Sequence, residues 1–446
     1  MNKRIVILGG GESGVGAALL AIKENYDVFV TDANKISDMY KEQLKVNNIL
    51  FEDGGHTKEI ILNADIIVKS PGVPEKSVIV QSIRQKGITI LSEIEFAYQY
   101  KGNSKIIAVT GSNGKSTTTS LVYHILKTAG LSCALVGNIG NSFAKQVAED
   151  PKQVYAIEVS SFQLDDIITF CPDIAILTNI TEDHLDRYDY SYEKYIASKF
   201  KILKNQTNKN VFIYCIDDAT TVKYLEKYLN KTNPLPYTMN KSLPQGAYII
   251  DSKMHLKWKN EEITMSIEDF AVKGKHNQYN TMAAALSGVV MDIRKEKIRE
   301  AVQTFESLEH RMEKVSTIKG VEFINDSKAT NINSTWFALE SMTKPTILIL
   351  GGIDKGNDYS LIMDLVRQKV KAIVCLGLDN NKIHEAFGKE IKNMTNTTSI
   401  EEAIKAAFHF AEKGDVVLLS PACASFDLFK NYEDRGDQYK QAVKNL

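Results

Sequence analysis

The stretch AVTGSNGKSTTTS, residues 108–120, contains the residue types of a loop that holds phosphate. Small residues let backbone N–H groups approach phosphate oxygens, and a helix that begins at such a loop points its positive end toward them. Lys115 would reach the outer phosphates, and the Ser116 hydroxyl would bind Mg²⁺. The strict pattern GxxxxGK[ST] fails at its first glycine, where this chain has Val109. We expect a phosphate loop; the alternative is a helix-capping loop with a surface lysine.

Two further candidates follow buried strands. Glu158 ends the run VYAIEVS, and His184 comes shortly after DIAILTNI. Parallel sheets present ligand-binding residues at the carboxyl ends of their strands, and Mg²⁺ prefers hard oxygen ligands such as a carboxylate. Glu158 is therefore a candidate magnesium ligand, with capping of the following helix as its alternative. His184 is a candidate site residue, with a purely structural histidine as the alternative.

A lysine on an apolar helix face is a third kind of candidate. In SYEKYIASKFKIL, Lys199 falls on the same helical face as Tyr195, Ile196 and Leu203. Such a lysine either extends its amine to solvent or loses its charge, because desolvation lowers its pKa. A neutral amine is able to react with CO₂, and the resulting carbamate would be an oxygen ligand for a second Mg²⁺. From these residues alone, extension to solvent is the favoured interpretation.

A second glycine-rich loop lies at the start of the chain. Gly9, Gly11 and Gly14 form the pattern GxGxxG between a strand and a helix, and Asp32 ends the next strand. This is the fingerprint of a nicotinamide-dinucleotide site. Its physical basis is more general, because glycines let the backbone approach any nucleotide diphosphate at a helix N-terminus. A tight strand–helix turn without a ligand is the alternative.

Alternation of strands and helices predicts an α/β protein with parallel sheets. Its 446 residues suggest about three domains. We expect a Rossmann-like domain over residues 1–100, a central P-loop-type ATPase α/β sheet over 101–306, and a second Rossmann-like domain over 307–446. The region 205–270 is less regular and is expected to hold an antiparallel extension. A hairpin that turns at Lys319-Gly320 is expected near the start of the third domain.

Composition and charge exclude several classes of protein. The formal net charge of -1 gives no reason to expect binding of nucleic acid or an anionic membrane. We find no apolar run of the ~20 residues that span a bilayer, and no signal peptide. The five cysteines form no CxxC pair, which favours reduced thiols in a cytoplasmic protein.

Several motifs in order resemble one known family. TGSNGKST, EVSSFQL, TNITEDHLDR, GKHNQYN, EHR, NDSKATN and LSPACASFDLFKNYEDRGDQ together are similar to the Mur ligases of peptidoglycan synthesis. The resemblance extends over essentially the whole chain and is strongest to the branch that joins D-glutamate to UDP-N-acetylmuramoyl-L-alanine. It implies that the first domain binds UDP, the central domain ATP, and the third domain the amino acid.

The resemblance implies a role for each matching residue. Catalytic roles fall to Lys115, His184, Lys199 (as a carbamate) and Lys328. ATP contacts are implied for Gly111, Ser112, Asn113, Gly114, Lys115, Ser116, Thr117, Asn277, Asn280, Arg311, Asp326 and Lys328. The sugar nucleotide would meet Gly11, Glu12, Ser13, Asp32, Ser70, Gly72, Asn138 and His184. D-Glutamate would meet Thr330, Lys355, Ser425 and Tyr432. Metal ligands would be Ser116, Glu158, His184 and Lys199.

The implied reaction uses ATP and Mg²⁺, with two ions expected. ATP would phosphorylate the L-alanine carboxylate to an acyl phosphate, which the D-glutamate amine would attack. A monomer that neither binds nucleic acid nor inserts in a membrane is expected. Three alternatives remain: a nicotinamide-dependent dehydrogenase, a non-catalytic ATP-binding protein of the same fold, and a related ligase that adds another amino acid.

Overall fold

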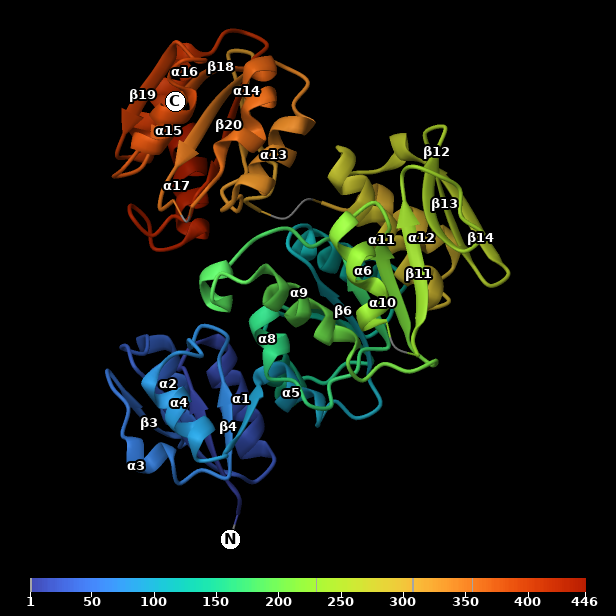
Figure 1. Ribbon diagram of the computed structural model, residues 1–446, viewed down its shortest axis with the longest axis vertical. Coiled ribbons are helices and arrows are strands. Elements are labelled where there is room, and N and C mark those ends of the chain that lie inside the picture. The colour runs from blue at the N-terminus through green and yellow to red at the C-terminus, as the bar shows by residue number, and fades with distance from the viewer. Residues whose placement is uncertain (1, 230, 307–308, 355) are drawn as a thin grey trace. The chain divides into compact units, whose positions relative to one another are not determined.

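The computed structural model describes residues 2–229, 231–306, 309–354 and 356–446. It divides into two compact units, Met1–Ala271 with Gln278–Phe305 and Val272–Asn277 with Glu306–Leu446. The first unit carries two sheets and the second carries one, each flanked by helices (Figure 1). The predicted α/β class with three sheet-bearing parts is confirmed. Across the described ranges, no helix is both long and apolar enough to span a bilayer.

The first sheet is parallel and has the strand order β3-β2-β1-β4-β5. Its strands are β1 (Arg4–Leu8), β2 (Asp27–Asp32), β3 (Leu50–Asp53), β4 (Ile66–Lys69) and β5 (Thr89–Ser92). The helices are α1 (Glu12–Lys23), α2 (Asp38–Val46), α3 (Lys58–Ile61), α4 (Val78–Gln85) and α5 (Glu93–Tyr98). The order reverses at β1, so the carboxyl ends of β1 and β4 flank a crevice of the kind that binds nucleotides.

The second sheet has the order β14-β13-β12-β11-β10-β9-β6-β8-β7. Its strands are β6 (Lys105–Thr110), β7 (Cys133–Gly137), β8 (Val154–Glu158), β9 (Ile174–Leu177), β10 (Val211–Cys215), β11 (Asn233–Thr238), β12 (Gly246–Ile250), β13 (Lys253–Trp258) and β14 (Glu261–Ser266). Strands β12, β13 and β14 pair antiparallel, which confirms the extension expected within residues 205–270 (Figure 1).

Helices cover the second sheet and connect its strands. They are α6 (Lys115–Thr128), α7 (Phe143–Glu149), α8 (Ser161–Asp165), α9 (Tyr192–Phe200), α10 (Ala219–Tyr228), α11 (Lys275–Val290) and α12 (Lys295–Thr304). Short 3₁₀ helices are η1 (Leu185–Tyr188), η2 (Lys201–Leu203) and η3 (Ile267–Asp269). Strands β9, β6 and β8 are parallel neighbours, so the loops that follow them lie at one edge of the sheet.

The third sheet has the order β15-β16-β20-β17-β18-β19. Its strands are β15 (Glu313–Ile318), β16 (Val321–Asn325), β17 (Thr346–Gly351), β18 (Val370–Leu376), β19 (Asn393–Thr397) and β20 (Val416–Ala422). The helices are α13 (Ile332–Ser341), η4 (Tyr359–Ile362), α14 (Met363–Lys369), α15 (Asn381–Phe387), α16 (Ile400–Phe410) and α17 (Tyr432–Lys444). The predicted hairpin is confirmed, because β15 and β16 pair antiparallel across Lys319-Gly320.

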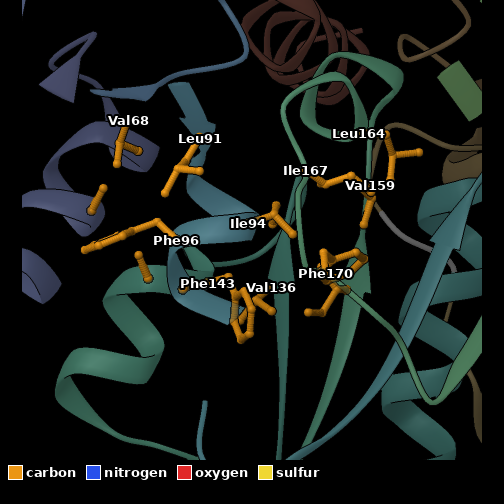
Figure 2. Packing of buried hydrophobic residues seen from close by; sticks show 14 of the residues in the cluster. Val68, Leu91, Ile94, Phe96, Val136, Phe143, Val159, Leu164, Ile167 and Phe170 are labelled. Carbon is orange, nitrogen blue, oxygen red and sulfur yellow. The ribbon is translucent and has the colours of Figure 1, made fainter. Parts of the chain in front are cut away.

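The first two sheets share one buried apolar cluster. Figure 2 shows Leu91, Ile94 and Phe96 from the β5–α5 segment packed in the same cluster as Phe143 and Phe170 of the second sheet's layer. Burial of large apolar side chains is the main source of cohesion between elements. The two sheets of the first unit are therefore joined by a common core and not only by the connecting chain.

Candidate active site

The loop after β6 has a backbone that only glycine adopts easily. Gly111 has φ +146° and Gly114 has φ +80°. A Cβ at Gly111 would lie 2.0 Å from Thr178 Oγ1, and one at Gly114 would lie 2.3 Å from Asn280 Oδ1. Helix α6 begins at Lys115, so its unpaired N–H groups open onto this loop. The strand–loop–helix order required of a phosphate loop is therefore present.

Hydrogen bonds to the segment after β9 hold this loop in place. The N–H of Asn113 donates to Asn179 Oδ1 at 3.0 Å, and the Ser112 hydroxyl donates to the Thr181 carbonyl at 2.8 Å. Lys115 Nζ donates to the Ser112 carbonyl at 2.8 Å, so its ammonium folds back over the loop. This arrangement concentrates positive charge where the helix begins.

Lys199 lies in α9, and its side chain extends to the same loop. It is only 2% exposed, and its Nζ donates to the Gly111 carbonyl at 2.7 Å. Burial, together with the nearby charge of Lys115, holds the pKa of Lys199 well below its usual value. The expectation that this amine extends to solvent is wrong, because the apolar face of α9 packs inward and carries the amine to the loop.

Glu158 lies at the carboxyl end of β8 and is 1% exposed. Its Oε1 accepts a hydrogen bond from Asn138 Nδ2 at 2.8 Å, and its backbone carbonyl accepts one from the Asn138 N–H at 2.9 Å. The capping alternative for Glu158 is wrong, because Ser160 caps α8 in a capping box with Gln163. The carboxylate is thus held beside Asn138 at the edge where the phosphate loop lies.

His184 follows β9 at this edge and immediately precedes η1. Its backbone is left-handed, with φ 53°. The ring packs edge-on against Phe162, with 5.3 Å between centroids, and its Nε2 lies 3.6 Å from Asp183 Oδ2. With 42% of its side chain exposed, the imidazole is open to a ligand from outside.

The residues of the first unit suit Mg²⁺ by the chemistry of their donors. The Ser116 hydroxyl and the Glu158 carboxylate are hard oxygen donors, whereas Lys199 offers a metal-binding oxygen only as a carbamate. Within the described ranges, no group of three or more His, Cys, Asp or Glu side chains forms a metal cluster.

A separate cavity of about 750 Å³ opens on the first sheet. Six residues predicted to bind the sugar nucleotide line it, namely Gly11, Glu12, Ser13, Asp32, Ser70 and Gly72. Asp32 is already engaged, because its carboxylate accepts hydrogen bonds from the N–H groups of Gly10 and Asn34, both at 2.8 Å. Its bond to Gly10 ties the glycine loop to the end of β2.

Sequence reasoning missed other residues that line this cavity. His56 and Lys58 lie just after β3, and Val78 begins α4. The imidazole Nδ1 of His56 lies 2.7 Å from Thr31 Oγ1. The position of β3 was the available signal, because residues at the carboxyl end of a strand beside β2 share an edge with Asp32.

In the second unit, predicted site residues gather around the end of β16. Asp326 is 7% exposed and accepts hydrogen bonds from Ser420 Oγ at 3.0 Å and the Met312 N–H at 3.3 Å. Lys328 Nζ lies 4.9 Å from the centre of the Tyr432 ring. The Thr330 N–H donates to the Lys328 carbonyl at 3.0 Å.

The other predicted residues have the following surroundings. Ser425 is buried in the segment after β20. Asn280 Oδ1 accepts from Thr118 Oγ1 at 3.2 Å beside the phosphate loop, whereas Asn277 Nδ2 donates to the Lys273 carbonyl at 2.8 Å. Arg311 lies near enough to Asp326 to favour its ionised form. Lys355 lies outside the described residues.

Asp326 gives a testable pH dependence. Burial raises its pKa from 3.8 to about 7. The folded state therefore binds a proton at Asp326 more tightly than the unfolded state. The contribution of this group to stability is greatest below pH 3.8 and falls as the pH rises to about 7, by up to about 4 kcal/mol. Asp326→Asn removes this titration. We expect the free energy of unfolding of the variant, minus that of the parent, to increase between pH 4 and pH 7.

Fluorescence of Trp336 in urea, in a Trp258→Phe background, would report unfolding of the second unit, because Trp336 lies in α13. The Asn side chain is able to accept from the Met312 N–H and to donate to Ser420 Oγ. The Ser420 hydroxyl is then able to donate to Thr335 Oγ1, which lies 3.2 Å from Ser420 Oγ. A difference that does not change with pH would contradict the burial of a protonated carboxyl at this position.

Three family models match successive parts of the chain. The MurD N-terminal domain matches residues 4–79, the Mur ligase middle domain residues 109–288, and the Mur ligase, glutamate ligase domain residues 310–423. The glycine loop and Asp32 lie in the first match, the phosphate loop, Glu158 and Lys199 in the second, and Asp326 in the third.

Full-length relatives and solved structures agree with these models. A UDP-N-acetylmuramoylalanine–D-glutamate ligase of Christiangramia forsetii is 53% identical over 446 residues, and one of Bacteroides fragilis is 50% identical over 445 residues, each match covering 100% of both chains. A UDP-N-acetylmuramate-alanine ligase of Thermotoga maritima has a TM-score of 0.65 at 17% identity over 99% of both chains. A MurF ligase of the same organism, in complex with ADP, has a TM-score of 0.60 at 14% identity over 94% of this chain and 95% of that one. These solved structures share the fold of the chain. The full-length relatives at 53% and 50% identity show that the chain belongs to the Mur ligase family.

Proposed function

We propose that this chain is an ATP-dependent ligase that joins D-glutamate to UDP-N-acetylmuramoyl-L-alanine in the synthesis of peptidoglycan precursors. The observation that carries the proposal is the match over the full length to relatives that bear this activity in their names, together with a first domain of the MurD type. The geometry of the phosphate loop and of the nucleotide-sized cavity supports it. The same geometry includes no feature that favours a nicotinamide-dependent dehydrogenase over this ligase.

Three parts of the chain have three tasks in this proposal. Residues 1–100 bind the uridine diphosphate in the cavity beside Asp32. The α1 N-terminus opens toward that cavity, where its partial positive charge attracts a diphosphate. Residues 101–306 bind ATP at the phosphate loop, and residues 307–446 bind D-glutamate. Asn138 and His184 contact the acceptor end of the sugar nucleotide.

The reaction must turn a poor electrophile into a good one. The L-alanyl carboxylate attacks the γ-phosphorus of ATP, the bond from that phosphorus to the bridging oxygen breaks, and ADP leaves. The D-glutamate amine then attacks the acyl carbon, loses a proton, and expels inorganic phosphate as the amide forms. Lys115 stabilises the charge that develops on the transferred phosphoryl group, because its ammonium lies over the loop.

One Mg²⁺ would be held by Ser116 and Glu158, and a second by His184 and the carbamate of Lys199. Bound Mg²⁺ would neutralise the charge of the phosphate groups. The chain's own part is to keep these donors in place. Asn138 orients the Glu158 carboxylate, and the Gly111 carbonyl orients the Lys199 amine. The lowered pKa of Lys199 favours the neutral amine that reacts with CO₂.

Residues of the second unit are proposed to bind the amino acid, and we propose that they add nucleotide contacts together with Asn280 of the first unit. Thr330, Ser425 and Tyr432, with Lys355, bind the D-glutamate carboxylates. Arg311, Asp326 and Lys328, with Asn277 and Asn280, contact the nucleotide. We further propose that the enzyme acts as a monomer in the cytoplasm, where ATP and UDP-linked sugars are available.

Oxygen transfer tests the acyl phosphate directly. With ¹⁸O in the L-alanyl carboxylate of the substrate, one labelled oxygen should appear in each inorganic phosphate released, because that oxygen bonds to phosphorus and leaves with it. Mass spectrometry of the phosphate would measure the label. Unlabelled phosphate, formed together with the amide product, would contradict the mechanism.

A further inference from the structure

Ser142, the N-cap of α7, is held from two helices of the first sheet. Its hydroxyl donates to Glu93 Oε1 at 2.7 Å, and its N–H donates to Glu12 Oε1 at 3.3 Å. A Cβ at Gly16 in α1 would lie 2.0 Å from Ser142 Oγ. Helix α1 thus contacts the cap so closely that the space for a methyl group is missing. Because Glu12 also lines the nucleotide cavity, Ser142 lies next to the wall of that cavity.

The loop that ends at Ser142 begins beside Glu158 at the carboxyl end of β8. In Gly137–Ser142, the Gly137 N–H donates to the Asn141 carbonyl at 3.1 Å, so the loop folds on itself. Gly140 has φ +72°, and a Cβ there would lie 2.3 Å from the Leu135 carbonyl oxygen. At its start, Asn138 holds the Glu158 carboxylate. One short, tightly folded loop therefore connects the carboxylate proposed to bind Mg²⁺ with the wall of the nucleotide cavity.

Glu93 is the side chain that holds the Ser142 end of this loop. It begins α5 and is 1% exposed. Its Oε1 accepts from the Ser142 hydroxyl and also from the Ala144 N–H at 2.6 Å. Its Oε2 is buried and has no hydrogen-bond partner among the residues that the structure describes. A buried carboxyl with one unpaired oxygen is costly to keep, so apolar packing does not explain its presence.

Glu95, two residues further along α5, provides a contrast. It is also fully buried, and its carboxylate accepts hydrogen bonds from the N–H groups of Ile168, Thr169 and Phe170 at 2.8–2.9 Å. Both glutamates fasten the first sheet to the second. Of these two glutamates, Glu93 is the one that contacts the Gly137–Ser142 loop, which contains Asn138.

We propose that Glu93 is a positioning residue for the ligase reaction: by holding Ser142 and Ala144, it keeps the Gly137–Ser142 loop in the one place where Asn138 orients Glu158 and Glu12 completes the nucleotide cavity. The proposal rests on the proposed function. It makes the distance between the sugar-nucleotide cavity and the phosphate loop depend on a residue that contacts neither ligand. Small displacements of reacting groups are known to cost up to about 100-fold in rate.

Glu93→Leu removes the acceptor oxygen at nearly constant volume. We expect kcat/KM for UDP-N-acetylmuramoyl-L-alanine to fall between about 10-fold and 100-fold. The affinity for an ATP analogue, measured by titration, should stay unchanged, because the phosphate loop is fixed by other hydrogen bonds. Hydrogen exchange of the amides of residues 137–142 should accelerate. Glu93→Gln keeps an acceptor for Ser142 and Ala144 and should restore most of the lost kcat/KM.

Glu95→Leu is the matched control. It removes the acceptor of the Ile168, Thr169 and Phe170 N–H groups, so it should lower the melting temperature while kcat/KM and exchange at 137–142 stay as in the parent. If Glu93→Leu does not fold, Ser142→Ala, which removes one hydroxyl, should show the same pattern with a smaller loss. Loop exchange that rises without a kinetic loss, or equal kinetic losses in the Glu95 variant, would overturn the proposal. A parent chain without D-glutamate-dependent turnover would instead contradict the proposed function, and the exchange result would still decide whether Glu93 fixes the loop.

Discussion

Replacing Lys115 with alanine should lower turnover at least ~100-fold, the scale of removing one positioned electrostatic group from an active site. Two anions, the substrate carboxylate and the γ-phosphate, must approach each other in the first step. The Lys115 ammonium already lies over the phosphate loop, 2.8 Å from the Ser112 carbonyl, so it is in place before ATP binds. The loss should appear in kcat, because the interaction strengthens as charge moves onto the transferred oxygens.

Lys127, in the last turn of the same helix, provides the control for Lys115. Its side chain is exposed, and Lys127→Ala should leave turnover unchanged. Steady-state assays of phosphate release at saturating substrates would compare the two variants. Near-normal turnover of Lys115→Ala would exclude the role of this lysine in phosphoryl transfer.

Replacing Lys199 with alanine should abolish most activity, and a short carboxylate such as formate or acetate should restore part of it. In the proposed account the lysine acts as a carbamate, so its alanine variant lacks a metal-binding oxygen and has space for an added one. The buried amine beside the Gly111 carbonyl shows that the side chain reaches the loop. Activity should therefore increase with carboxylate concentration in the variant and not in the parent.

Two further variants separate this chemistry from packing. Lys199→Met keeps the length of the side chain and fills the space, so it should be inactive and should not respond to carboxylate. Lys201→Ala, two residues along the chain, removes a partly exposed amine that pairs with Asp165 at 2.7 Å, and it should remain active. Full activity of Lys199→Ala without additive would mean that the amine serves only in packing.

Local patterns in the sequence were sufficient for the phosphate loop, since glycines, a lysine and a helix start within a few residues determine its shape. The same is true of the antiparallel extension and of the Lys319-Gly320 hairpin. The outcome for Lys199 was different. Its helical face was identified correctly, but the partner of its amine, the Gly111 carbonyl, is 88 residues away in the sequence. Only the packing of α9 against α8 and against the loop after β6 decides that the amine is buried and not extended to solvent.

The Glu93 and Ser142 contact could not be predicted for a similar reason. The two residues are 49 positions apart and lie in helices that flank different sheets. A glutamate at the start of a short helix normally suggests an exposed cap. His56 and Lys58 were missed because β3 is a short edge strand with a weak apolar pattern. For Glu93 and Ser142, the sequence pattern lacks the position of one sheet layer against another.

Release of phosphate from ATP, measured with UDP-N-acetylmuramoyl-L-alanine, Mg²⁺ and one amino acid at a time, tests the central claim most directly. The panel is D-glutamate, L-glutamate, L-lysine, diaminopimelate and no amino acid. The account predicts release with D-glutamate alone, matched by a product heavier by one glutamyl unit. Release with a different amino acid, or no release with D-glutamate, would contradict it.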